Sequence, residues 1–125
     1  MSRKDIQRIP DYLEHILEAI ERIHLYVEDM TEVAFLEDKK TQDAVIRNFE
    51  IMGEAAHNIE SYHSDYANAH FEVPWSIMYA LRNRVSHGYF KVDYELIWTT
   101  IHNDLFELHQ QIKQLLDAKS EKNPV

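Results

Sequence analysis

The first thirty residues carry apolar side chains at alternating intervals of four and three. The series consists of Ile9, Leu13, Ile16, Ile20, Ile23, Val27 and Met30. A seven-residue repeat of this kind is typical of a helix that packs lengthwise against other helices. Pro10 suits the first turn of such a helix, so the pattern predicts a helix over about residues 10–30.

The next segments continue the helical pattern. Two glycines and three prolines in 125 residues leave few points at which a helix must end. Thr31 is a suitable N-cap for a short turn over residues 32–36. Apolar residues then recur from Val45 to Ile59, which predicts a second long helix over about residues 40–59.

The second half of the chain predicts two more helices. Residues 61–73 show no helical period and are expected to form a loop. Pro74 is expected to begin a shorter helix that stops at Gly88. Asp93 is a suitable N-cap for a last helix that runs to about residue 118, with a frayed, disordered tail over 119–125.

These segments together predict an all-α fold. No stretch alternates apolar and polar residues as a half-buried strand does. Helices of this number and length are expected to form an antiparallel bundle of four to five helices. At 125 residues the chain is expected to be a single domain over 1–125.

Composition narrows the classes of function. The net charge is −9, from 22 acidic and 13 basic residues, so the chain is not expected to coat a polyanion along its length. Any contact with RNA would have to be made by a local basic site. The chain has no cysteine, which excludes thiolate metal sites and a cysteine nucleophile. With no apolar leader or membrane-length apolar run, we expect a cytoplasmic protein that does not contact membranes.

Charged and aromatic residues crowd around one of the two glycines, in the sequence L-R-N-R-V-S-H-G-Y-F at 81–90. Arg82 and His87 are five residues apart, so on a regular helix their directions differ by about 140°. They would converge through a distortion at Gly88, or by facing a second subunit across a symmetric dimer. The spacing therefore favours a site shared between two chains.

Arginine and histidine together suit the cleavage of RNA. The ribose 2′-OH is a built-in nucleophile, and a histidine with a near-neutral pKa can transfer its proton. An arginine matches the geometry of a phosphate group and stabilises its developing charge. The alternative for Arg82, Arg84 and His87 is the basic end of a helix, where cations interact favourably with the helix dipole.

The segment from Arg82 to Tyr89 matches R-x4-H-x-Y and resembles the signature of HepT-type toxins with the HEPN fold. Pro74-Trp75 before it resembles the segment that precedes the family motif, and 90–93 followed by Trp98 resembles its continuation. Gly53-Glu54-Ala55 resembles the family's G-E-A element. The resemblance covers most of the chain.

The resemblance implies a helical bundle that dimerises with both motifs in one cleft. It implies a metal-independent endoribonuclease toxin without a cofactor, with Arg82 and His87 as the catalytic pair. It further implies a cognate antitoxin, a nucleotidyltransferase of the MntA type, which uses ATP to transfer AMP to Tyr89 and so silences the toxin. The residues expected to support RNA or nucleotide contacts are Asn83, Arg84, Ser86, Gly88, Glu54 and Arg47.

Several alternatives stay open at this stage. Arg47, Glu54 and Asn58 share one stripe of the second long helix, which either lines the cleft or faces solvent. Glu54 could pair with Arg82 or with Arg84. Gly53 within a helix indicates close approach of another backbone.

Two broader alternatives concern metals and activity. The other seven histidines show no i, i+4 pairing with a helical carboxylate, so no metal site is expected. The rival to an enzyme is a non-catalytic helical module that binds nucleotide and partners a nucleotidyltransferase.

Overall fold

The structure, a computed structural model, describes residues 6–86 and 92–122. Within these residues it contains helices and no strand. The helices are α1 (Ile9–Val27), α2 (Glu32–Leu36), α3 (Lys39–Tyr62), α4 (Ser64–Ala69), α5 (Trp75–Ser86), α6 (Tyr94–Asn103) and α7 (Leu105–Lys122). The prediction of an all-α bundle is confirmed.

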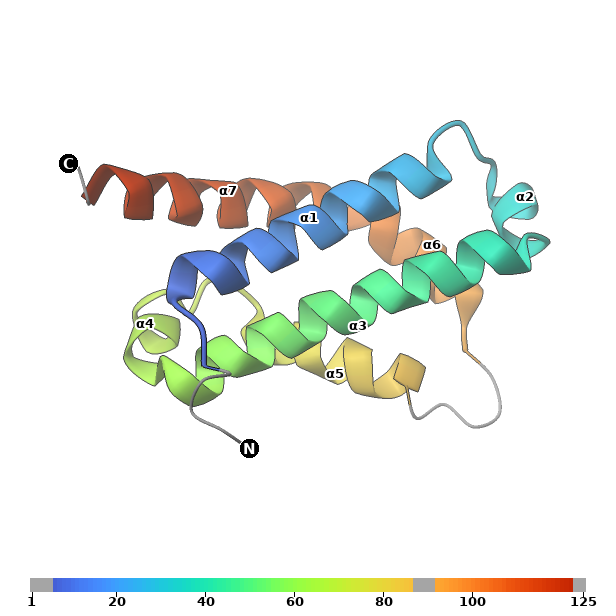
Figure 1. Cartoon of the computed structure of the whole chain (residues 1–125). Helices are drawn as coiled ribbons and strands as arrows, with labels where there is room; N and C mark the ends of the chain where they lie inside the picture. Colours follow the sequence, from blue (N-terminus) through green and yellow to red (C-terminus); the bar gives the residue numbers. More distant parts are fainter. Residues whose placement is uncertain (1–5, 87–91, 123–125) are drawn as a thin grey trace.

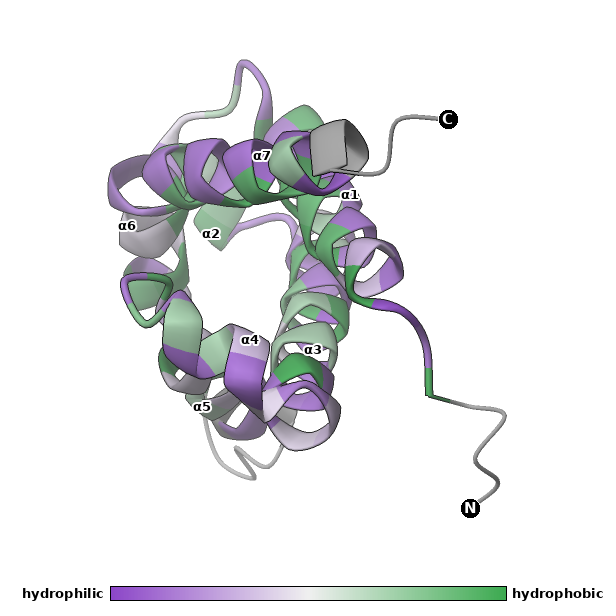
Figure 2. Ribbon diagram, turned by 90° about the vertical axis from the view of Figure 1, so that its left-hand side faces the viewer, coloured by the Kyte–Doolittle hydropathy of each residue, from purple (hydrophilic) through white to green (hydrophobic). Residues whose placement is uncertain are grey.

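The long helices surround one apolar core (Figures 1 and 2). Helix α3 lies between α1 and α5 and packs against both, while α1 also packs against α7. The short helices α2 and α4 close the two ends of α3. The largest fully buried side chains include Leu13, Phe35, Phe49, Met52 and Ile112. The apolar repeat of the first thirty residues therefore faces the interior.

Side-chain caps explain where several helices begin. Thr31 Oγ1 accepts a hydrogen bond from the Ala34 backbone N–H, and Asp93 Oδ1 accepts one from that of Leu96. Both residues were predicted as caps, and both predictions are confirmed. Asp38 caps α3 in the same way, with Thr41 as donor. Each cap supplies a partner for a backbone N–H group that has none within its helix.

The structure corrects the prediction for residues 61–73, where Ser64–Ala69 forms α4. A helix of six residues is too short to show a period in the sequence. Its one buried residue, Ala67, is small, so the apolar signal was also weak.

The last predicted helix is in fact two, α6 and α7, which meet at Asp104. The Thr100 hydroxyl donates to the Leu96 carbonyl, and the His102 ring contacts the Trp98 carbonyl, each four residues back. Side chains that bond to carbonyls of their own helix compete with its backbone ladder and bend it.

Three predicted helix ends also move. Helix α1 ends at Val27 rather than near residue 30, and Asp29 follows with a positive φ of 64°. Helix α3 extends to Tyr62. Helix α7 runs to Lys122, so residues 119–122, which the sequence predicted to be frayed, are helical. None of the described helices is long and apolar enough to cross a bilayer.

Candidate active site

Helices α3 and α5 touch at Gly53, and this contact places Arg82. A Cβ atom on Gly53 would lie 2.3 Å from Arg82 Cβ and 2.7 Å from the Met78 carbonyl oxygen. Neither distance is possible for real atoms, so only glycine allows the two helices to come this close. The close approach anticipated from Gly53 in the sequence is therefore present, and Arg82 emerges directly above α3.

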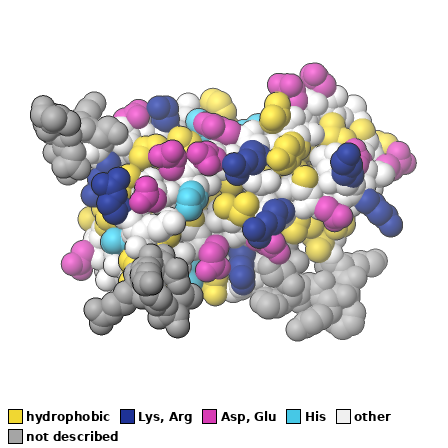
Figure 3. Space-filling model, viewed as in Figure 1, with side chains coloured by type: hydrophobic (Ala, Val, Ile, Leu, Met, Phe, Trp, Pro, Cys, Tyr) yellow, Lys and Arg dark blue, Asp and Glu magenta, His cyan; other side chains and the backbone are white. Residues whose placement is uncertain are grey.

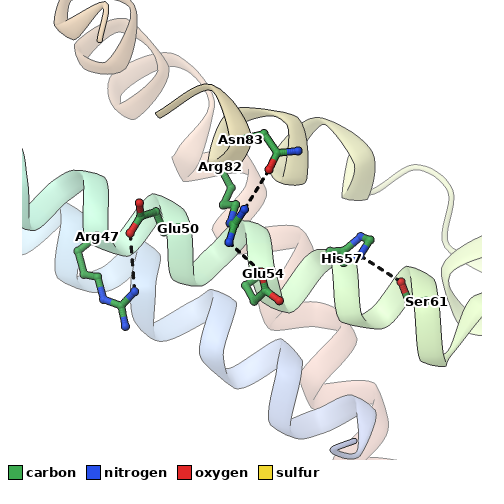
Figure 4. A network of polar contacts seen from close by, with 7 residues as sticks. All are labelled: Arg47, Glu50, Glu54, His57, Ser61, Arg82 and Asn83. Carbon is green, nitrogen blue, oxygen red and sulfur yellow. Dashed lines mark hydrogen bonds and ion pairs between the residues drawn. The ribbon is translucent and has the colours of Figure 1, made fainter. Parts of the chain in front are cut away.

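The Arg82 guanidinium reaches across α3 (Figure 4). Its Nη2 lies 3.5 Å from Glu54 Oε1, and its Nη1 donates a hydrogen bond of 3.0 Å to Asn83 Oδ1. Of the two partners that the sequence allowed for Glu54, the structure shows Arg82. The Arg82 Nε is buried and has no hydrogen-bond partner in the described part of the chain. The Arg82 side chain as a whole is 29% exposed.

An aromatic stack supports the same arginine. The His57 and Tyr79 rings are nearly parallel, with their centroids 4.0 Å apart. The Arg82 guanidinium carbon lies 5.9 Å from the centroid of the Tyr79 ring, within the range of a cation–π contact. His57 also contacts the Ser61 hydroxyl at 3.4 Å. The sequence analysis did not single out His57 and Tyr79 as site residues, because their contact joins helices far apart in the chain.

Arg82 also lines a cavity of about 390 Å³ between α1 and α3. Arg47 and Glu54 line the same cavity, so three of the predicted site residues meet there. Arg47 Nη1 lies 3.7 Å from Glu50 Oε1. Of the two alternatives for the polar stripe of α3, the structure therefore favours a lined cavity over a purely solvated face.

Two cavity residues, Tyr12 and His15, come from α1 and were missed by the sequence analysis. They flank the apolar repeat of the first helix and are spaced three apart, so they share a face. That spacing is a usable signal only once the neighbouring helix is known.

Other predicted site residues cannot be placed. His87, Gly88 and Tyr89 lie outside the described residues, and so does the predicted stop of the helix at Gly88. The backbone of Arg84 and Ser86 belongs to the last turn of α5, but their side chains are outside the description. Among the described residues, no group of three or more histidine, aspartate or glutamate side chains is placed to hold a metal ion.

Comparison with known proteins places the sequence among related chains. The sequence matches the HepT-like family, described as "Ribonuclease HepT-like", over residues 16–115. A protein of Thermococcus cleftensis named "Probable ribonuclease HepT" is 43% identical over 105 residues, which cover 84% of this chain and 93% of that protein.

Two further relatives have similar coverage. A protein of Methanocaldococcus jannaschii named "Putative RNase MJ0127" is 40% identical over 119 residues, covering 92% of this chain and 93% of the relative. One of Caldanaerobacter subterraneus named "Putative RNase TTE0752" is 35% identical over 108 residues, covering 86% and 94%. No solved structure matches the chain. The match over residues 16–115 and these identities establish that the chain belongs to the HepT-like family.

Proposed function

We propose that this protein is a metal-independent endoribonuclease and the toxin of a toxin–antitoxin pair that acts in the cytoplasm. The observation that carries the proposal is the setting of Arg82. Its guanidinium is held by Glu54 and Asn83, and its partly exposed side chain lines a polar cavity. Relatives that cover most of the chain carry ribonuclease names, which supports the same activity.

The proposed reaction uses the nucleophile that RNA already contains. A base removes the proton of the ribose 2′-OH, and its oxygen bonds to the adjacent phosphorus as the bond to the 5′-oxygen breaks. An acid protonates that 5′-oxygen, and the products are a 2′,3′-cyclic phosphate and a 5′-hydroxyl end. Arg82 stabilises the added negative charge of the phosphorane. His87 transfers the protons.

A homodimer completes the proposed site. One histidine cannot easily serve both proton transfers at opposite sides of the phosphorus, whereas two subunits would bring two copies of His87 to one cleft. This arrangement also answers the difficulty that Arg82 and His87 point in different directions on a regular helix.

Regulation by adenylylation forms the second half of the proposal. An MntA-type nucleotidyltransferase would transfer AMP from ATP to the Tyr89 hydroxyl, releasing diphosphate. The added phosphate and adenosine would occupy the anion site beside Arg82 and repel RNA. The rival function is a helical module that partners the nucleotidyltransferase without cutting RNA.

The test of the enzyme is cleavage of RNA by purified protein in the presence of EDTA, with analysis of the product ends. We expect cyclic phosphate ends, and losses in rate of about 10²–10³-fold for Arg82→Ala and at least about 10²-fold for His87→Ala. His102→Ala is the matched histidine control, since its ring bonds to its own helix. Unchanged cleavage by His87→Ala would remove that residue from the mechanism.

The test of regulation is the intact mass after co-expression with the nucleotidyltransferase partner and ATP. We expect a gain in AMP-sized steps that Tyr89→Phe abolishes. If the protein gains AMP but its unmodified form does not cleave RNA, the interaction module is supported instead.

A further inference from the structure

The cavity beside Arg82 extends well past the arginine itself. It runs along α3, where Arg47, Ile51, Glu54 and Asn58 share a stripe, and α1 forms its opposite wall. Eleven residues separate Arg47 from Asn58, which corresponds to about 16 Å of helix. A volume of about 390 Å³ lies within the range of small-molecule sites, so the cavity has more room than one phosphate group needs.

Two of its polar side chains are not engaged by the described part of the protein. The Asn58 amide and the His15 ring make no hydrogen bond there, although His15 contacts the edge of Tyr12, with ring centroids 6.5 Å apart. Asn58 offers both a donor and an acceptor, and His15 offers a planar ring. This is the combination that recognises the edge and the face of an unstacked RNA base.

The two arginines of the cavity have carboxylate partners at long distance, and Arg47 is the less firmly held of the two. The distances from Arg47 to Glu50 and from Arg82 to Glu54 are 3.7 and 3.5 Å, longer than a charge-assisted hydrogen bond of about 2.8 Å. The Arg47 side chain is 71% exposed, and exposed ion pairs contribute little to stability. A phosphodiester can therefore replace Glu50 as the partner of Arg47 at a small cost in free energy.

The described residues of this face do not form a competing basic patch. Figure 3 shows basic, acidic and hydrophobic side chains interspersed over the described residues of α1 and α3. With a net charge of −9, contact with RNA has to be concentrated where two arginines meet in one hollow.

We propose that this cavity is a subsite for the ribonucleotides that flank the scissile phosphate, with the phosphate of one on Arg47 and the base of another against His15 and Asn58. The assignment rests on the proposed function for the position of the scissile phosphate at Arg82. In this arrangement the stripe of α3 holds the RNA strand so that the scissile phosphate lies at Arg82. The ligand chemistry is that of a ribonucleoside monophosphate, and we assign it to an RNA strand rather than to free AMP.

The experiment measures binding apart from cleavage, by fluorescence anisotropy of a labelled, fully 2′-O-methylated RNA pentamer of mixed sequence. This probe lacks the 2′-OH nucleophile and cannot be cut. We expect Arg47→Ala and Asn58→Ala each to weaken binding about tenfold. Arg47→Ala should also reduce the slope of log K against log salt concentration by about 0.7, the value for one phosphate contact on a single strand.

The matched control for Arg47→Ala is Arg22→Ala. Arg22 also pairs with a glutamate on its own helix at 3.7 Å, but it lies outside the cavity. It should leave the affinity and the salt dependence unchanged. If Arg47→Ala and Arg22→Ala weaken binding equally, the effect is one of general charge and the subsite is overturned. The subsite is also overturned if neither substitution changes the affinity.

Two further arms separate this inference from the enzyme proposal and from free nucleotide. If unmodified RNA is not cleaved but the pentamer still binds through Arg47, the ribonuclease proposal fails and the subsite stands. If RNA is cleaved normally and the cavity variants bind the pentamer like the parent, the subsite fails alone. Competition by AMP as strong as that by unlabelled pentamer would overturn the assignment to an RNA strand.

Discussion

Helix α3 meets α5 through a steric fit, whereas α1 meets α6 and α7 through histidines. The first contact depends on Gly53, which has no side chain to separate the two helices. In the second, the His109 ring lies 2.9 Å from a Glu21 oxygen, and the Ile101 backbone acts to raise the pKa of the His24 ring. Both contacts are backed by the same apolar core.

The difference shows which part of the fold fixes the proposed active site. Arg82 stands on the α3–α5 contact, where a shift of the backbone would move its guanidinium directly. The α1–α7 contact holds the other side of the bundle and contributes no residue to the cavity beside Arg82 from α6 or α7. Changes at the first contact should therefore alter activity and stability together, and changes at the second should alter stability alone.

The largest effect is expected from Gly53→Ala. Alanine is favoured over glycine in a helix by about 1 kcal/mol, but its Cβ would overlap Arg82 and the Met78 carbonyl. We expect a net loss of about 1–3 kcal/mol in the free energy of unfolding, measured in urea, and a fall in RNA cleavage of at least tenfold. Asp43→Ala, at an exposed position of α3, is the control. A Gly53→Ala protein more stable than the parent would contradict the close contact.

A smaller effect, on activity, is expected from Glu54→Gln. The pair with Arg82 is half-exposed, so the free energy of unfolding should change by less than about 0.5 kcal/mol. The guanidinium loses its charged partner and is held less firmly, so kcat should fall several-fold. KM should not rise, because the carboxylate competes with the phosphate. Steady-state cleavage kinetics check this, and a raised KM with unchanged kcat would contradict the positioning role.

At the other contact, His109→Gln should affect stability only. It removes the contact with Glu21, a partly exposed polar pair whose loss lowers the free energy of unfolding by up to about 1 kcal/mol. The rate of RNA cleavage should match that of the parent. His102→Gln is the control, since its ring bonds within α6 and not across helices. A large loss of cleavage in His109→Gln would end the distinction between the two contacts.

The smallest effect is a dependence on pH. Burial lowers the pKa of His24, and the nearby His109 and His102 lower it further, against the raising effect of the Ile101 carbonyl. The unfolded chain therefore binds a proton more readily than the folded one, so His24 contributes stability above pH 6.5 that is lost as the pH falls. Melting temperatures between pH 7.5 and 5 should fall less steeply in His24→Gln than in the parent. A steeper fall in His24→Gln than in the parent would contradict the lowered pKa of His24.

Much of the fold could be predicted from local chemistry. The apolar repeat from Ile9 to Val27 and the caps Thr31 and Asp93 act within one or two turns, so the sequence alone reveals them. The short helix α4 and the bend at Asp104 were missed, because each depends on a few residues whose propensities are weak.

The candidate site was predictable only in part. Arg82 and Glu54 were named from the sequence, and Gly53 signalled a close approach. Tyr12, His15, His57 and Tyr79 were not named as site residues. Their roles come from contacts between α1, α3 and α5, and no periodicity within one helix encodes which neighbour it will face.

By itself the sequence determined that the chain is helical and that it belongs to the HepT-like family. Only the tertiary structure decided that Glu54 pairs with Arg82 and which helix completes the cavity beside it. The physical reason is that helix formation depends on residues three and four apart. The position of a guanidinium over another helix depends on how closely two backbones can approach, and at Gly53 that distance is set by a missing Cβ.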